Sequence, residues 1–194
     1  MLKLSLHKRL VQHDLYKNLP KTIESLNNLI PRIEKDIAAL EAYATASIFE
    51  YRGVKYDLSD PVQLKDAVKA LPKSTWGLKA GDTFGTFNGM TMILAEQNSW
   101  SSLFSSKDLV IVLQGNAAHR IDGNPITNGR RMLELSQRII SIIPKSLDEK
   151  KEKLRSNEMA LTAATELVNE SFEQEELLMQ LKEEYAEITR SLAA

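Results

Sequence analysis

Residues 19–40 read LPKTIESLNNLIPRIEKDIAAL, and this stretch decides the fold of the chain. Its aliphatic side chains are spaced alternately four and three residues apart, which places them along one face of an α-helix. The residues concerned are Leu19, Ile23, Leu26, Ile30, Ile33, Ile37 and Leu40. A continuous apolar stripe of this kind predicts a helix that packs lengthwise against a second helix.

A second apolar stripe recurs at every seventh residue in the C-terminal half. Its members are Leu133, Ile140, Leu147, Leu154, Leu161 and Val168. Lys150 and Asn157 fall on the half of the heptad that would complete this stripe, alongside Ser136, Ile143 and Ala164. A buried Asn157 would fix the helix register, whereas at the stripe's edge it would simply face water.

Three prolines interrupt the two stripes without changing their phase. They are Pro20 and Pro31 in the first stripe and Pro144 in the second. Proline removes one amide donor and clashes with the preceding turn, but it can be accommodated as a bend. We therefore expect kinks within continuing helices.

The segment between the stripes carries signals for strands and tight turns. Arg52-Gly53 and Asn88-Gly89 predict two β-hairpins, over residues 48–58 and 84–95. The dense glycine spacing of residues 81–89 suits two turns flanking a strand. The apolar run 109–113 is expected at the centre of the sheet.

One short helix is predicted within this segment. Asp60 as the N-cap and Pro61 at the first helical position start it, and Pro72 ends it, giving a helix over 61–71. It is expected to bury Val62, Val68 and Leu71, together with Leu64 or Ala67.

The predicted fold class is therefore α+β: a long antiparallel helical hairpin, or coiled coil, with an inserted small antiparallel β head that contains one short helix. We expect an N-terminal coiled-coil helix over 1–46, the head over 47–125 and a returning coiled-coil helix over 126–170. A capping box at residues 171–174 predicts a C-terminal helix over 171–194.

Composition limits the classes of function. The chain of 194 residues has 43% hydrophobic and 26% charged residues, which is typical of a folded protein. It has no cysteine, hence no disulfide, and no apolar run long enough to cross a membrane. The N-terminus lacks the apolar core of a signal peptide, so a cytoplasmic location is expected.

The sequence offers little for catalysis. His7, His13 and His119 are scattered without a partner at metal-ligand spacing, and no phosphate-binding glycine loop is present. We expect no enzymatic activity, no metal and no cofactor.

Aromatic and basic side chains are the candidates for binding. Trp76, Trp100, Arg52, Lys55 and Lys79 lie at turn or strand positions of the head and are predicted to meet a protein partner. Phe49, Tyr51 and Phe87 are expected in the core. Lys8, Arg9, Arg130 and Arg131 are candidates for nucleic-acid contacts, although a net charge of −1 favours only weak binding.

The order of segments resembles the C-terminal region of the large helicase–methyltransferase proteins of phages, plasmids and conjugative elements. Four pieces carry the resemblance: residues 19–37, Phe49 to Tyr56 with the helix 64–71, Phe84-Gly-Thr-Phe-Asn-Gly-Met90, and Ser171-Phe-Glu-Gln-Glu-Glu-Leu177. Asn88 stands where the family's strand has Arg, and Ser171 where its helix start has Pro. The resemblance implies a mobile-element setting beside DNA-processing machinery, without the helicase or methyltransferase activity.

Three functions stay open from the sequence. The first is a noncatalytic accessory module that binds a nucleic-acid-processing protein, or its DNA. The second is a stand-alone inhibitor of a host defence complex, of the anti-CRISPR type, and the third is a structural homo-oligomer held together by the apolar stripe.

Overall fold

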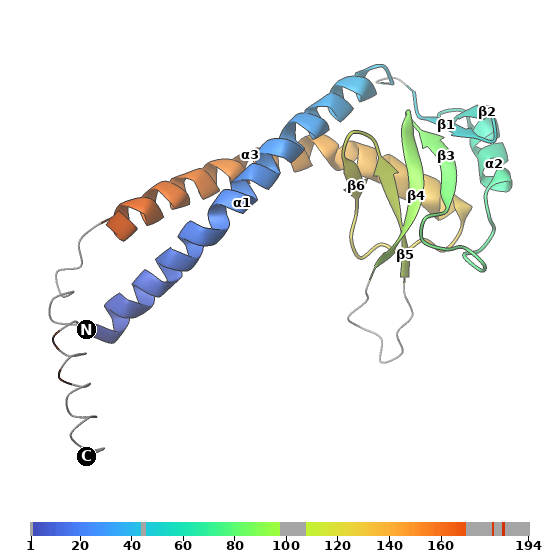
Figure 1. Cartoon of the computed structure of the whole chain (residues 1–194). Helices are drawn as coiled ribbons and strands as arrows, with labels where there is room; N and C mark the ends of the chain where they lie inside the picture. The colour runs from blue at the N-terminus through green and yellow to red at the C-terminus, as the bar shows by residue number, and fades with distance from the viewer. Residues whose placement is uncertain (1, 44–45, 98–107, 170–179, 181–183, 185–194) are drawn as a thin grey trace, which may run out of the picture. The chain divides into compact units, whose positions relative to one another are not determined.

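The computed structural model describes residues 2–43, 46–97 and 108–169, together with residues 180 and 184; for residues 2–16 and 167–169 it describes only the backbone. The fold is α+β, with three helices and a six-stranded antiparallel sheet among these residues (Figure 1). The chain divides into two compact units, residues 25–153 and residues 1–24 with 154–194, each described by itself.

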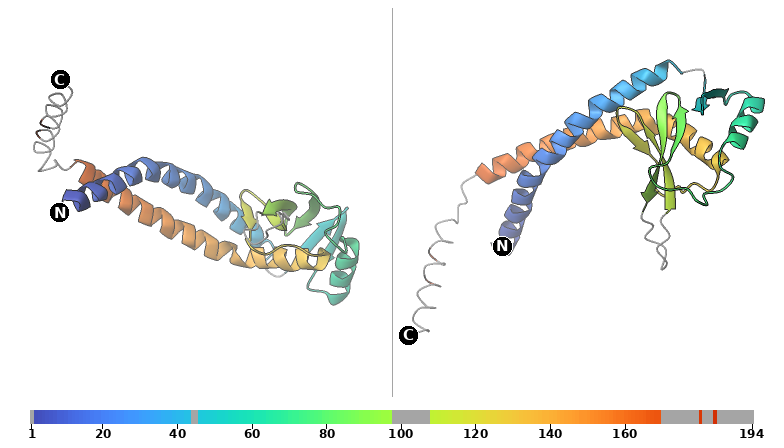
Figure 2. Two further views of the ribbon diagram at one scale, coloured as in Figure 1. Left: turned by 90° about the horizontal axis from the view of Figure 1, so that it is seen from below. Right: turned by 45° about the vertical axis from the view of Figure 1, so that its right-hand side comes forward.

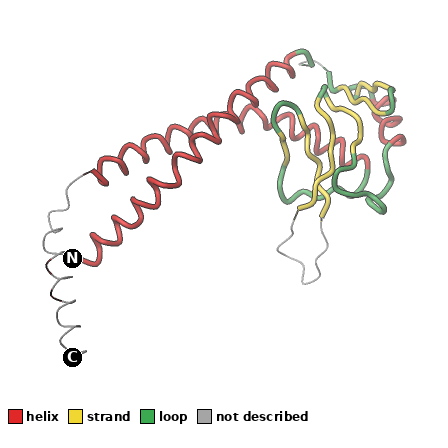
Figure 3. The backbone as a smooth tube through the Cα atoms, in the orientation of Figure 1, coloured by secondary structure: helices red, strands yellow, loops and turns green. Residues whose placement is uncertain are grey.

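Two long helices correspond to the two apolar stripes (Figure 3). Helix α1 spans Leu2–Glu41 and helix α3 spans Gly129–Asn169. Both continue through their prolines, as the unbroken phase predicted. The stripe in α1 is buried or half-buried from Leu19 to Leu40, because an amphipathic helix is stabilised mainly by covering its apolar face.

The sheet has the strand order β2-β1-β3-β4-β5-β6, with every neighbouring pair antiparallel. The strands are β1 (Ile48–Tyr51), β2 (Val54–Asp57), β3 (Thr83–Phe87), β4 (Met90–Gln97), β5 (Asp108–Gln114) and β6 (Ala118–Arg120). Both predicted hairpins are present. Arg52 and Asn88, with φ of 53° and 45°, adopt the left-handed conformation that these two-residue turns require.

One prediction about the sheet was wrong. The run 109–113 forms most of β5, which lies next to the edge strand β6 rather than at the centre. Its continuous apolar character has another cause, since Val110, Ile111 and Leu113 are all buried. The first part of α3 crosses one face of the sheet (Figure 2) and contributes Met132, Leu135 and Ile139 to the core.

Helix α2 (Pro61–Ala70) begins as predicted, with the Asp60 carboxylate accepting a hydrogen bond of 2.8 Å from the Val62 amide. It buries a narrower face than expected. Ala67 and Leu71 are buried, but Val62 is 67% exposed and Leu64 is exposed as well, so the expectation for Val62 was wrong. Val68, which was also expected to be buried, is half-buried, and the ten-residue helix lies beside β2.

In the unit formed by residues 1–24 and 154–194, Leu19 and Ala164 are buried. Asn157 is half-buried, and its side-chain nitrogen is a buried donor without a hydrogen-bond partner in the described structure. An unsatisfied buried donor is costly. Asn157 thus lies on the inner side of the stripe, which was one of the two interpretations left open.

Candidate partner-binding site

The start of the loop between α2 and β3 is held against the first residue of α3. Pro72 ends α2, and its carbonyl accepts a hydrogen bond of 2.8 Å from the amide of Gly129, the first residue of α3. Leu71 is 3% exposed and packs closely against Gly129. A Cβ added to Gly129 would lie only 2.3 Å from the Cβ of Leu71. This loop therefore leaves the core from a tightly packed junction.

Trp76 lies at the corner of a hydrogen-bonded β-turn in this loop. The Leu78 amide donates to the Thr75 carbonyl over 3.1 Å, and Gly77 has a φ of +81°. A positive φ at the third position is characteristic of a type II turn, and the second position then projects from the chain. Trp76 occupies that second position and is 93% exposed.

A second turn fastens the other end of the loop to the sheet. The Lys79 amide donates to the Asp82 carboxylate over 2.8 Å, and the Asp82 amide donates to the Lys79 carbonyl over 3.1 Å. Two backbone hydrogen bonds, of 2.8 and 2.9 Å, join Gly81 and Asp82 to Leu94 of β4. With both ends held, little backbone entropy remains to be lost when a partner contacts Trp76.

A groove of about 470 Å³ adjoins this turn. It is lined by Thr75, Leu78, Lys79, Ala80, Glu96, Asp108, Leu109, Pro125 and Ile126. An exposed aromatic residue beside a partly apolar groove is the arrangement that binding hot spots use. Of the predicted partner-binding residues, Lys79 lines this groove, whereas Trp76 lies on the adjoining turn and is not part of the lining.

Two further predicted partner-binding residues, Arg52 and Lys55, do not line the groove. Arg52 is exposed at the β1–β2 turn, with its guanidinium 5.0 Å from the centre of the Tyr51 ring. Lys55 is exposed on β2 and forms an ion pair of 3.7 Å with Glu50. Trp100 lies outside the described residues.

The nucleic-acid candidates have different surroundings. Arg130 and Arg131 share one carboxylate, Glu134, at 3.0 and 3.6 Å. Arg131 is half-buried and also donates to Asn124. Both charges are therefore partly neutralised. Lys8 and Arg9 belong to α1, but their side chains lie outside the described part of the chain.

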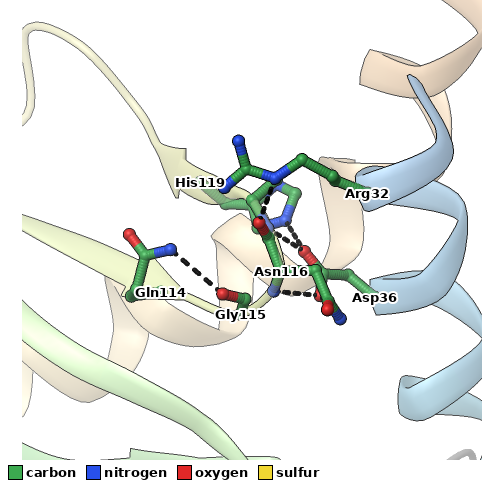
Figure 4. Close-up of polar contacts among 7 residues, drawn as sticks. Arg32, Asp36, Gln114, Gly115, Asn116 and His119 are labelled. Atoms are coloured by element: carbon green, nitrogen blue, oxygen red, sulfur yellow. Dashed lines mark hydrogen bonds and ion pairs between the residues drawn. The ribbon is translucent and has the colours of Figure 1, made fainter. Parts of the chain in front are cut away.

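A buried polar cluster that the sequence did not predict joins α1 to the β5–β6 turn (Figure 4). Asp36 is 2% exposed and accepts four hydrogen bonds. They come from the Asn116 amide (2.6 Å), the Asn116 side chain (2.9 Å), the Ala117 amide (2.8 Å) and His119 Nε2 (2.8 Å). Arg32 donates to the Asn116 carbonyl on the same turn.

The sequence shows no partner for His119 at metal-ligand spacing, and the partner that the fold gives it is a single carboxylate from a distant helix. His119 is 8% exposed on β6 and is paired with Asp36, which lies 83 positions away in the sequence. Because an ionised carboxylate only accepts hydrogen bonds, Nε2 is the protonated ring nitrogen here. Gly115 is required in the turn, since a Cβ would lie 2.5 Å from the Asp36 carboxylate.

The cluster predicts a loss of stability in acid. Burial raises the pKa of Asp36, but the hydrogen bonds from His119, Ala117 and Asn116 outweigh it, and the pKa lies below its ordinary value of 3.8. The ionised form is thus favoured by folding, so its stabilising effect is complete above the ordinary pKa and is lost as the pH falls through the folded-state pKa.

We expect the free energy of unfolding of the wild type to fall steadily below about pH 4. In an Asp36→Asn variant this fall should be shallower, because the titrating group is gone. Urea unfolding at a series of pH values measures both slopes, and equal slopes would contradict the prediction. The pKa of Asp60 is lowered too, through its hydrogen bonds to Val62 and Gln63, so some acid sensitivity should remain in the variant.

No protein-family model matches this sequence, and no curated protein or solved structure matches it significantly. The resemblance to helicase–methyltransferase proteins therefore stays a prediction. Among the described residues, no helix is long and apolar enough to cross a membrane.

Proposed function

We propose that this chain is a noncatalytic binding module whose β head docks onto a protein partner through the Trp76 turn and the groove beside it. One observation carries the proposal: a tryptophan that is 93% exposed on a turn held at both ends by hydrogen bonds. Tryptophan is enriched at interface hot spots, and a rigid display lowers the entropic cost of binding.

The second part of the proposal is that α1 and α3 form an antiparallel helical hairpin that supports the head. Within residues 25–153, the Lys151 ammonium lies 2.7 Å from the Glu34 carboxylate, which joins the two helices. Ser136, Ile143 and Ala164, on the completing half of the heptad, are all buried. These features support a coiled-coil seam formed within one chain.

The sequence resemblance supports a setting for the module: a mobile genetic element, where the partner would be a DNA-processing protein. A stand-alone inhibitor of a host defence complex would use the same surface on a different protein. A protein partner is favoured over DNA because Arg130 and Arg131 both pair with Glu134. A surface already neutralised in this way releases few counterions from DNA.

The test is a comparison of Trp76→Ala with the wild type in affinity capture from nuclease-treated host lysate. We expect the partner retained by the wild type to be lost from the variant, with affinity for the purified partner reduced at least thirtyfold, or roughly 2 kcal/mol. The identity of that partner would distinguish a DNA-processing protein from a defence complex.

Val62→Ala is the matched control, because Val62 is also a strongly exposed apolar residue of the head but lies on α2, outside both the Trp76 turn and the groove. This variant should keep the partner. Retention of the partner by Trp76→Ala would overturn the proposal. If the partner were lost only when the charges of Arg130 and Arg131 are reversed, or only after nuclease treatment, the contact would be assigned to nucleic acid instead.

A further inference from the structure

A second pocket, separate from the groove beside the Trp76 turn, lies between α1, β6 and α3 within residues 25–153. Its volume is about 190 Å³. Its apolar walls come from the two helices and consist of Leu29, Ile33, Ile139, Ile142 and Ile143. The edge strand β6 forms the remaining wall through Ala118, His119 and Arg120.

The polar side of the pocket is formed by two donors on one face of α3. Ser146 and Lys150 are four residues apart, which is about one helical turn, and both line the pocket. Both are half-buried. Among the residues that the structure describes, neither the Ser146 hydroxyl nor the Lys150 ammonium has a hydrogen-bond or ion-pair partner, whereas the adjacent Lys151 is paired with Glu34.

The remaining polar groups of the lining are already engaged. His119 donates to Asp36, whose carboxylate is saturated by four hydrogen bonds, and Arg120 pairs with Asp122 at 2.9 Å. No acidic side chain lines the pocket in the described structure. Its electrostatic character is thus set by the unpaired Lys150, a half-buried cation that favours an anion beside it.

We propose that this pocket binds a small aliphatic carboxylate. The carboxylate would accept hydrogen bonds from Ser146 and Lys150, and the alkyl chain would lie against Leu29, Ile33 and Ile142. The volume equals that of about six water molecules at roughly 30 Å³ each, so a chain of five or six carbons is the size that fits.

Titration of the ¹⁵N-labelled full chain with hexanoate, followed by amide chemical shifts, tests the proposal. We expect saturable shifts confined to residues around the pocket, with a dissociation constant on the order of millimolar. Hexan-1-ol and hexylamine have the same alkyl length without the negative charge, and both should bind more weakly by roughly tenfold or more.

Lys150→Met removes the charge but keeps the apolar stem, and should weaken hexanoate binding roughly tenfold. Lys153→Met, which changes an exposed lysine of the same helix, is the matched control and should leave binding unchanged. Ala118→Trp, at an exposed position of the pocket wall, should block binding while the rest of the spectrum stays folded.

Three results would overturn the proposal: no saturable shift with hexanoate, equal affinity for hexan-1-ol, or equal losses in Lys150→Met and Lys153→Met. None of them bears on the Trp76 site, whose test uses a different ligand and different variants.

Discussion

Replacing Asp36 with Ala is expected to lower the free energy of unfolding by about 3–5 kcal/mol, since removing one partner of a buried charged cluster leaves the others unsatisfied. The variant would strand the Asn116 and Ala117 amides and the His119 ring, which all donate to this carboxylate. It would also leave a cavity where α1 meets the β5–β6 turn. Few other single changes in the described structure remove four hydrogen bonds at once.

Urea unfolding at neutral pH, followed by circular dichroism, measures this effect. Asp148→Ala, which changes an exposed aspartate on α3, should alter the free energy of unfolding by less than about 0.5 kcal/mol. A double-mutant cycle with His119→Ala should give a coupling energy of about 1–3 kcal/mol, because the two side chains are in direct contact. Additive effects would mean that the Asp36–His119 bond contributes nothing of its own.

The elements that depend on neighbouring residues could be predicted from the sequence. Arg52-Gly53 and Asn88-Gly89 form tight turns because each pair accepts positive φ angles, and this requirement is local. The Asp60-Pro61 helix start is local in the same way. The stripe in α1 repeats over six helical turns, so its period is clear despite two prolines.

The features that depend on distant residues could not be predicted. Strand β6 has only three residues, and its pairing with β5 decides which strand lies at the edge. Asp36 comes three residues after Ile33 on the flank of the stripe, where a charged residue is usually solvated, and its partners are 80 to 83 residues away. Trp76 was predicted as a partner-binding residue from its place in a loop, but its exposure could not be predicted, and the groove beside it is formed by four separate segments.

Gly85→Ala is expected to destabilise the sheet by about 3–5 kcal/mol, a range reached only when a substitution forces the backbone to move. Gly85 lies inside β3 with a φ of +76°, where the register with β4 shifts. An added Cβ would lie 1.8 Å from the Glu50 carbonyl oxygen of β1, so the two strands must separate. Gly85 therefore marks a β-bulge inside β3, whereas Gly81 and Gly89 lie in the two turns that were predicted to flank this strand.

Gly53→Ala separates the two causes, because Gly53 has a similar φ of +78° but open space around its Cα. The free energy of unfolding of that variant should fall by only about 1–2 kcal/mol, which is the conformational cost of a positive φ angle at a residue other than glycine. Urea unfolding and hydrogen exchange of the β3 and β4 amides measure both variants. The difference between the two losses of unfolding free energy is the cost of the contact between the added Cβ and Glu50. Equal losses would mean that β1 and β3 do not approach each other as closely as the structure shows. The glycine at position 85 would then be needed only for its positive φ angle.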